Sequence, residues 1–126
     1  PDMANANGFD PRNFDLGQDV KQINGEHDLF GDGSVSLIPT YGHTPGHQSM
    51  KIKLARGDIV LTGDACYMRK TLDDLHLPHK SFMHDAEGMI ASLHKIRELQ
   101  KRGARIFYGH DVEHWANVPQ APLEVV

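Results

Sequence analysis

The sequence predicts an α+β fold, in which a mixed or antiparallel sheet is covered on one face by a helix. The first half contains short apolar runs separated by Gly, Pro, Asn and Asp, which is typical of strands joined by turns. The second half contains one long segment with helical spacing and then one more apolar run. This order favours a layered arrangement within a single domain. One helix covers only one sheet face, so we expect the other face to need a partner layer.

The N-terminal part is expected to be irregular before it enters a hairpin. Residues 1–18 show no apolar period, and Asp10-Pro11 is a turn signal. A short strand is predicted over residues 20–23. Residues 27–30 would form its partner, because Asn24-Gly25 is a strong hairpin dipeptide. The sheet would therefore begin with a two-stranded hairpin.

Three further strands are predicted in the middle of the chain. A tight turn at Gly31-Asp32-Gly33 precedes a strand over residues 35–39. Residues 49–54 alternate apolar and polar side chains, which indicates a half-buried strand. The turn Arg56-Gly57-Asp58 then leads to a continuous apolar run over residues 59–61, which we interpret as a fully buried strand.

A helix and a final strand are predicted in the C-terminal half. Residues 66–85 form a long connection without a clear period, and such loops are usually functional or mobile. Asp85 is expected to cap a helix that begins at Ala86 and stops at Gly103. A buried strand over residues 105–108 follows, and the tail after it is expected to be irregular. The apolar residues with helical spacing are Met89, Leu93, Ile96 and Leu99.

The composition excludes several classes of protein. The chain is 39% hydrophobic and 24% charged, as is ordinary for a soluble globular domain. A net charge of −4 without a basic run gives no reason to expect nucleic acid. No apolar stretch approaches the ~20 residues that span a bilayer, and the first residues are too polar for a signal peptide. The single cysteine, Cys66, excludes an internal disulfide and makes a cytoplasmic location the expectation.

Three polar side chains lie beside the ends of predicted strands. His47 lies in a Gly/Pro-rich loop between two strands, Asp64 follows the buried run at 59–61, and His110 follows the last strand. Taken singly, each is more typical of a loop residue that hydrogen-bonds the backbone. Together they are ligand types that zinc and similar ions accept, at the place where open sheets put their sites. A carboxylate can bridge two metals roughly 3.5–4 Å apart, which hold a hydroxide between them.

Four motifs occur in order along the chain, from about Asp28 to Asp111. The segment that contains these motifs, about two thirds of the chain, resembles the C-terminal half of a metallo-β-lactamase-fold hydrolase. Within that superfamily it most resembles the N-acyl-homoserine lactonases, the quorum-quenching enzymes. The fold implied is therefore half of an αββα sandwich. The motifs are Phe30-Gly31-Asp32-Gly33-Ser34-Val35, His43-Thr44-Pro45-Gly46-His47-Gln48-Ser49, Leu61-Thr62-Gly63-Asp64-Ala65-Cys66-Tyr67 and Phe107-Tyr108-Gly109-His110-Asp111.

The resemblance implies a site with two divalent metal ions, of which zinc is the expected type. His47 would bind one ion, Asp64 would bridge both, and His110 would bind the other. Tyr67 would hydrogen-bond the carbonyl or ring oxygen of a lactone, so Asp64 and Tyr67 are the expected catalytic residues. His43 would either contact a metal ligand or simply lie in the loop, and would itself bind no metal. The implied reaction opens a lactone ring by attack of a metal-bridging hydroxide.

The resemblance also places Phe82 and Met83 near the segment that, in the family, lines the pocket for the acyl chain of the substrate. The family's first metal motif, His-x-His-x-Asp-His, is absent from this sequence. We therefore interpret residues 1–126 as one partial domain that needs an N-terminal half from the same or a separate chain, and that is inactive alone. Assembly into a homo-oligomer is left open by the sequence.

Other functions stay open at this stage. Within the superfamily they are a thioesterase, which Tyr67 after Asp64 disfavours, and a phosphotriesterase. Outside enzymes, the alternative is an inactive fragment or an interaction domain. Two further residues have simpler interpretations. His114 follows His110 by four residues but is expected at the surface, and Cys66 is expected to be a small buried residue.

Overall fold

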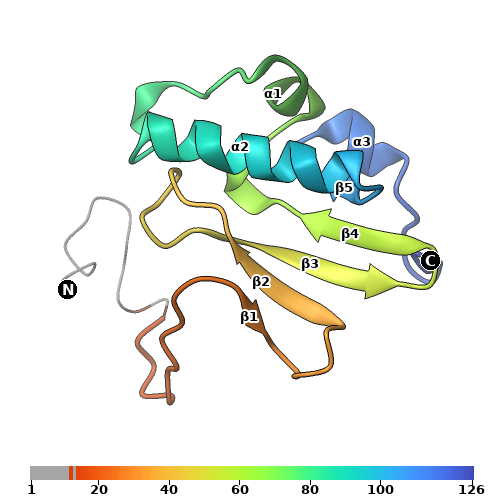
Figure 1. Ribbon diagram of the computed structural model, residues 1–126, viewed down its shortest axis with the longest axis horizontal. Coiled ribbons are helices and arrows are strands. Elements are labelled where there is room, and N and C mark those ends of the chain that lie inside the picture. Colours follow the sequence, from red (N-terminus) through yellow and green to blue (C-terminus); the bar gives the residue numbers. More distant parts are fainter. Residues whose placement is uncertain (1–11, 13) are drawn as a thin grey trace.

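A five-stranded sheet with one long helix across it forms the framework of the computed structural model, which describes residues 12 and 14–126 (Figure 1). The predicted α+β fold with a mixed sheet is confirmed. The turn expected at Asp10-Pro11 lies outside the described residues. In chain order the strands are β1 His27–Asp28, β2 Val35–Pro39, β3 Gln48–Leu54, β4 Gly57–Leu61 and β5 Arg105–Phe107. The helices are α1 Arg69–Asp74, α2 Ala86–Lys101 and α3 Val112–Ala116, with 3₁₀ turns η3 Gly63–Ala65 and η4 Lys80–Phe82.

The strands follow one another across the sheet in chain order. β1 to β4 form an antiparallel meander, whereas β4 and β5 pair in parallel. A parallel pair needs a crossover, and the segment with α1, η4 and α2 provides it. These pairings make β2, β4 and β5 run in the same direction. The segments after all three strands therefore emerge at one edge of the sheet.

The helix α2 forms where the spacing predicts it and packs against one face of the sheet. The Asp85 carboxylate accepts hydrogen bonds from the backbone N–H groups of Glu87 at 3.1 Å and Gly88 at 3.0 Å, which caps the first turn. The residues that the helix buries recur at intervals of three and four, so one stripe faces the sheet. This stripe consists of Met89, Ser92, Leu93 and Ile96.

One hydrophobic core lies between α2 and the sheet. Val60 lies in β4, which has a partner strand on each side, and it is fully buried in this core. Arg97 ties α2 to α1, since its Nε donates to the carbonyl of Leu72 at 2.8 Å. The buried members of the core are Ile38, Val60, Ala65, Cys66, Leu72, Leu93, Ile96, Ile106 and Tyr108.

The opposite face of the sheet carries an apolar row that α2 does not cover. Successive residues of a strand point to opposite faces, so the neighbours of the core residues face away from α2. The cross-strand register aligns these side chains into one row. Near β5, α3 contributes to covering the row, because the ring centroid of Trp115 lies 5.9 Å from that of Phe107. The row consists of Leu37, Met50, Leu61 and Phe107.

The predicted N-terminal hairpin is wrong. Residues 20–23 form no strand, and Val20 is 72% exposed, so no packing would offset the cost of ordering a strand there. β1 pairs with β2 instead, at the edge of the sheet. Asp28 holds the connecting turn, because its carboxylate accepts hydrogen bonds from the backbone N–H groups of Phe30, Gly31 and Gly33.

Two segments expected to be irregular contain helices. The connection over 66–85 contains α1, and the tail contains α3. Neither segment has a clear apolar period, and both helices are too short to be stable without tertiary contacts. Asp111 supports both of them, since its carboxylate accepts from the backbone N–H of Arg69 at 2.8 Å and of His114 at 2.9 Å.

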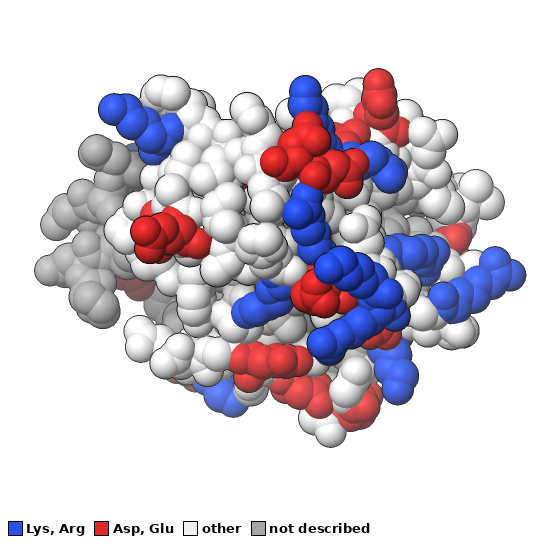
Figure 2. Space-filling view, turned by 45° about the horizontal axis from the view of Figure 1, so that its top comes forward, with Lys and Arg blue, Asp and Glu red and all other residues white. Residues whose placement is uncertain are grey.

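Charges of both signs are mixed on one face of the molecule. On the face shown in Figure 2, Lys and Arg side chains lie among Asp and Glu side chains, in keeping with the net charge of −4. The helices in the described part of the chain all lack the length and apolar character needed to cross a bilayer.

Removal of the α2 cap gives a test of this framework. Asp85→Ala removes both acceptors for the first turn, and we expect the free energy of unfolding to fall by about 1 kcal/mol. Asp85→Asn keeps a capping oxygen and serves as the control. The measurement is chemical denaturation followed by circular dichroism, and equal stability of Asp85→Ala and the wild type would contradict the assigned cap.

Candidate metal centre

Three loops meet at the edge of the sheet where β2, β4 and β5 end. The loop after β2 carries His43 and His47, η3 after β4 carries Asp64, and the segment after β5 carries His110. Main-chain hydrogen bonds also join the segments that follow β4 and β5, because the backbone N–H of His110 donates to the carbonyl of Tyr67 at 2.8 Å. These residues are therefore held at one edge by main-chain pairing.

Asp64 lies at the centre of the cluster, and each of its carboxylate oxygens faces an imidazole. His110 Nε2 lies 2.7 Å from Asp64 Oδ1, and His43 Nε2 lies 3.3 Å from Oδ2. The backbone N–H of Asp64 donates to His47 Nε2 at 3.2 Å. The Asp64 side chain is 40% exposed and that of His110 is 62% exposed, so the cluster opens to solvent.

Two glycines allow the loops to approach this closely. A Cβ atom on Gly63 would lie 3.2 Å from His47 Nε2, and φ is +52° there, in the region that favours glycine. A Cβ atom on Gly109 would lie only 2.4 Å from the carbonyl oxygen of Gly63. Glycine at position 109 therefore lets the backbones before Asp64 and His110 touch, and glycine at position 63 leaves room for the His47 ring.

His47 is held from both sides of its ring. Its Nδ1 lies 2.9 Å from Thr40 Oγ1, behind the ring, while its Nε2 faces the backbone of Asp64. Burial is the main cause that lowers the pKa of His47, and the neighbouring His43 lowers it further. The ring is therefore favoured in its neutral form, which is the form that binds metal.

His43 and Tyr67 contact each other next to Asp64. His43 Nδ1 donates to the carbonyl of Phe82 at 2.7 Å, and the Tyr67 hydroxyl lies 3.2 Å from the same nitrogen. The Tyr67 ring also contacts His110, with 5.0 Å between the ring centroids. Burial and then the charge of Asp64 raise the pKa of Tyr67, so its hydroxyl keeps its proton near neutral pH and can donate it.

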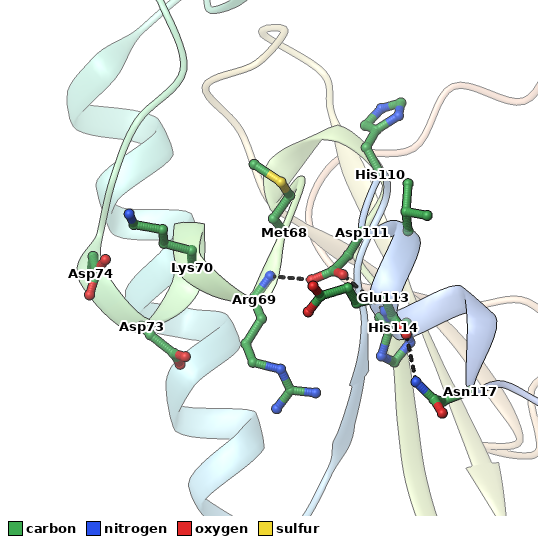
Figure 3. Close-up of a pocket in the computed structure, with 11 residues that line it drawn as sticks. Met68, Arg69, Lys70, Asp73, Asp74, His110, Asp111, Glu113, His114 and Asn117 are labelled. Carbon is green, nitrogen blue, oxygen red and sulfur yellow. Dashed lines mark hydrogen bonds between the residues drawn. The ribbon is translucent and has the colours of Figure 1, made fainter.

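An open hollow of about 660 Å³ lies beside His110, between α1 and α3. Figure 3 shows the ring of His110 and the carboxylate of Asp111 projecting in different directions. Asp111 faces the backbone of both helices, and these hydrogen bonds lower the pKa of its carboxyl. Asp111 is therefore a structural residue. The hollow is lined by Met68, Arg69, Lys70, Asp73, Asp74, His110, Asp111, Val112, Glu113, His114 and Asn117.

The donor atoms present fit part of a metal centre. Over the described residues, no group of three or more His, Cys, Asp or Glu side chains could hold a metal ion by itself. The set nevertheless has the right chemistry, since a carboxylate with an imidazole beside each oxygen is an arrangement that divalent ions such as zinc accept. His47, Asp64 and His110 would hold metal only together with donors from elsewhere.

The structure brings together the residues that the sequence singled out, and it adds one. His47, Asp64, Tyr67 and His110 converge, and the Phe82 backbone touches the cluster through His43. Met83 is half-buried next to Phe82. The added member is His43, which contacts the Asp64 carboxylate directly, one of the two positions that the sequence left open for it.

Two residues outside the cluster can be compared with their expectations. The surface role expected for His114 is wrong, because its Nε2 is buried and its ring lies 5.1 Å from Phe107 and 5.2 Å from Tyr108 between centroids. Cys66 is fully buried, as expected, and burial raises the pKa of its thiol to about 12. The thiol of the metal-free protein is therefore favoured in its protonated form at neutral pH.

Comparisons of the sequence relate the chain to known proteins. The family model described as the metallo-beta-lactamase superfamily matches residues 3–110. The chain is 32% identical over 132 residues to N-acyl homoserine lactonase AttM of Azorhizobium caulinodans, covering 97% of this chain and 48% of that protein. It is 36% identical over 95 residues to N-acyl homoserine lactonase AiiA of Bacillus thuringiensis subsp. kurstaki, covering 74% of this chain and 36% of that protein.

Solved structures give the same result for the fold. The chain superimposes with a TM-score of 0.73 and 32% identity on an N-acyl homoserine lactone hydrolase with N-hexanoyl-L-homoserine bound at its catalytic metal center. The match covers 83% of this chain and 41% of that one. A dizinc quorum-quenching lactonase, AidC, has a TM-score of 0.56 at 22% identity, which is evidence of a shared fold. The chain thus spans about half the length of the curated relatives it matches.

The contact between Gly109 and Gly63 can be tested by mutation. Gly109→Ala puts a methyl group against a backbone carbonyl, so we expect the loops to separate and the protein to lose about 1–3 kcal/mol of stability. Gly46→Ala is the matched control, since a Cβ atom there meets nothing within 4 Å. Thermal unfolding of both variants is the measurement. Equal melting temperatures would show that the loops do not need this close approach.

Proposed function

This chain belongs to the metallo-beta-lactamase superfamily, and from this premise we propose that it supplies half of a metal-dependent hydrolase that opens the lactone ring of N-acyl-homoserine lactones. The observation that carries the proposal is the position of Asp64, with one imidazole beside each carboxylate oxygen and the Tyr67 ring within contact of His110. The relatives named N-acyl homoserine lactonases support the substrate class.

The ligand roles follow from the donor atoms. His47 would bind one divalent ion through Nε2, His110 would bind a second, and Asp64 would bridge the two. When bound, such ions polarise a carbonyl oxygen and provide a hydroxide nucleophile near neutral pH. We expect zinc, because nitrogen and carboxylate donors suit it. In the absence of metal, the hydrogen bond between His110 and Asp64 keeps the two side chains together.

Tyr67 is the residue that would act on the substrate. Its protonated hydroxyl is a donor, and its raised pKa keeps it so across the neutral range. Placed beside Asp64, it would donate to the carbonyl or ring oxygen of the lactone, where negative charge develops as the ring opens. Phe82, which is 61% exposed, and Met83 would contact the acyl chain.

The remaining donors would come from an N-terminal half carried by the same or a separate chain. Two observations support this. Among residues 12 and 14–126, no full covering layer lies over the apolar row on the sheet face away from α2, and His110 and Asp64 are open to solvent. We therefore expect this half to pack on that face and complete the metal site. A cytoplasmic location and the absence of a nucleic-acid or membrane partner remain predictions, and self-assembly is open.

The bridging role of Asp64 can be tested in the full-length protein. We expect Asp64→Asn to lower kcat/KM for an N-acyl-homoserine lactone by at least about 100-fold and to lower the bound metal, because an amide bridges two cations poorly. Asp58→Asn, at the opposite end of β4, is the control. Ring opening is followed by proton release and metal by elemental analysis. A rate like that of the wild type in Asp64→Asn would refute the assignment.

The role of Tyr67 is separable from metal binding. We expect Tyr67→Phe to lower kcat by about 100-fold, because one donor to the developing charge is lost, while the metal content stays at the wild-type level.

Turnover of thioesters or phosphotriesters in preference to lactones by the wild type would overturn the proposed substrate class. A full-length protein that holds metal and hydrolyses none of the three would refute the proposed function altogether.

A further inference from the structure

A row of buried hydroxyl groups runs from His47 into the sheet. Thr40 follows β2, Ser49 lies in β3, and Thr62 follows β4, so the row crosses three neighbouring segments. Thr40 Oγ1 lies 2.9 Å from His47 Nδ1 and 2.8 Å from Ser49 Oγ, and Ser49 Oγ donates to the carbonyl of Thr62 at 3.1 Å. Thr40 and Thr62 are fully buried, and Ser49 is 1% exposed. Water therefore has no access to the hydroxyls of Thr40 and Ser49.

Both ends of this row have a defined polarity. At one end, the Thr62 carbonyl can only accept a hydrogen bond. At the other end, the backbone N–H of Asp64 can only donate, and it donates to His47 Nε2 at 3.2 Å. A neutral imidazole carries one proton, so an Nε2 that accepts requires an Nδ1 that donates. With both ends fixed in this way, each hydrogen bond between His47 and the Thr62 carbonyl has one consistent donor and one consistent acceptor.

We propose that Thr40 and Ser49 are positioning residues that hold His47 in the tautomer with its proton on Nδ1 and its lone pair on Nε2. In this arrangement His47 Nδ1–H donates to Thr40 Oγ1, the Thr40 hydroxyl donates to Ser49 Oγ, and the Ser49 hydroxyl donates to the Thr62 carbonyl. The lone pair of Nε2 then faces the Asp64 side of the cluster.

The reverse direction conflicts with the surrounding groups. If Ser49 donated to Thr40 and Thr40 to Nδ1, then Nε2 would carry the proton. That N–H would face the backbone N–H of Asp64 at 3.2 Å, so two donors would oppose each other. A clash of this kind is unfavourable, because both donors lose their partners. The sheet thus selects one tautomer.

The consequence is a ligand prepared before metal arrives. A ligating histidine usually donates its other ring N–H to a fixed acceptor, which sets the tautomer and the ring orientation, and loss of that acceptor typically lowers metal affinity about 10–100-fold. Thr40 would provide this acceptor for His47, and Ser49 would orient Thr40. The metal-affinity part of this inference rests on the proposed function, whereas the tautomer is a property of the metal-free protein.

The experiment measures the tautomer directly in the full-length protein. Metal-free protein labelled with ¹⁵N-histidine is studied at pH 8 by long-range ¹H–¹⁵N correlation spectroscopy, with His47 assigned by its loss in His47→Gln. We expect a protonated Nδ1 and an unprotonated Nε2. A proton on Nε2 in the wild type would overturn the inference, whatever the variants do.

Variants test which groups set the tautomer. Thr40→Val removes the acceptor at nearly constant volume, so we expect the Nε2–H form to appear and zinc affinity, measured by competition with a chelator, to fall about 10–100-fold. Thr40→Ser restores the hydroxyl and both readouts. Ser49→Ala leaves the Thr40 proton only Nδ1 to donate to, so it also favours the Nε2–H form.

Thr71→Val is the matched control, because Thr71 is a buried threonine in α1 outside the row. It should change neither the tautomer nor the affinity. An unchanged tautomer in both Thr40→Val and Ser49→Ala would refute the positioning role, and if Thr40→Val does not fold, Ser49→Ala decides it. An Nδ1–H tautomer in a protein that hydrolyses no lactone would remove the proposed function and leave this inference intact.

Discussion

The parallel pairing of β4 with β5 is the constraint on which the candidate site depends. It aligns Leu61 with Phe107, so the segments after both strands leave the sheet at the same edge. The pairing continues past the strands, since the Thr62 N–H donates to the Phe107 carbonyl at 3.0 Å. Asp64 and His110 lie 46 residues apart in the chain, yet their side chains come within 2.7 Å. An antiparallel β5 would put His110 at the far edge.

The crossover between these strands explains the rest of the architecture. A parallel pair requires a long connection, and α2 uses it to cover one face of the sheet and build the core. The same burial reaches the site, because the core lies directly behind it. It lowers the pKa of His47 and shields the hydroxyls of Thr40 and Ser49, which would exchange partners with water in an exposed loop. Packing and site chemistry therefore share one cause.

Regular periods in the sequence predicted most of the fold correctly, and weak signals misled. The helix Ala86–Lys101 and the strand Gly57–Leu61 have strong patterns that packing reinforces, and both are present. The hairpin over 20–23 rested on one dipeptide with little apolar surface to bury, and it does not form. α1 and α3 gave no signal, since such short helices depend on tertiary contacts, here the carboxylate of Asp111.

By itself, the sequence determined which side chains to expect at the candidate site. His47, Asp64, Tyr67 and His110 lie next to strand ends and in family motifs, and both signals can be read from the local sequence. Only the tertiary structure decided the contacts of each atom. It brought His43 to Asp64 and joined Thr40 to Ser49 behind His47, because hydrogen bonds between residues on different strands depend on the register of the sheet, which no local pattern encodes.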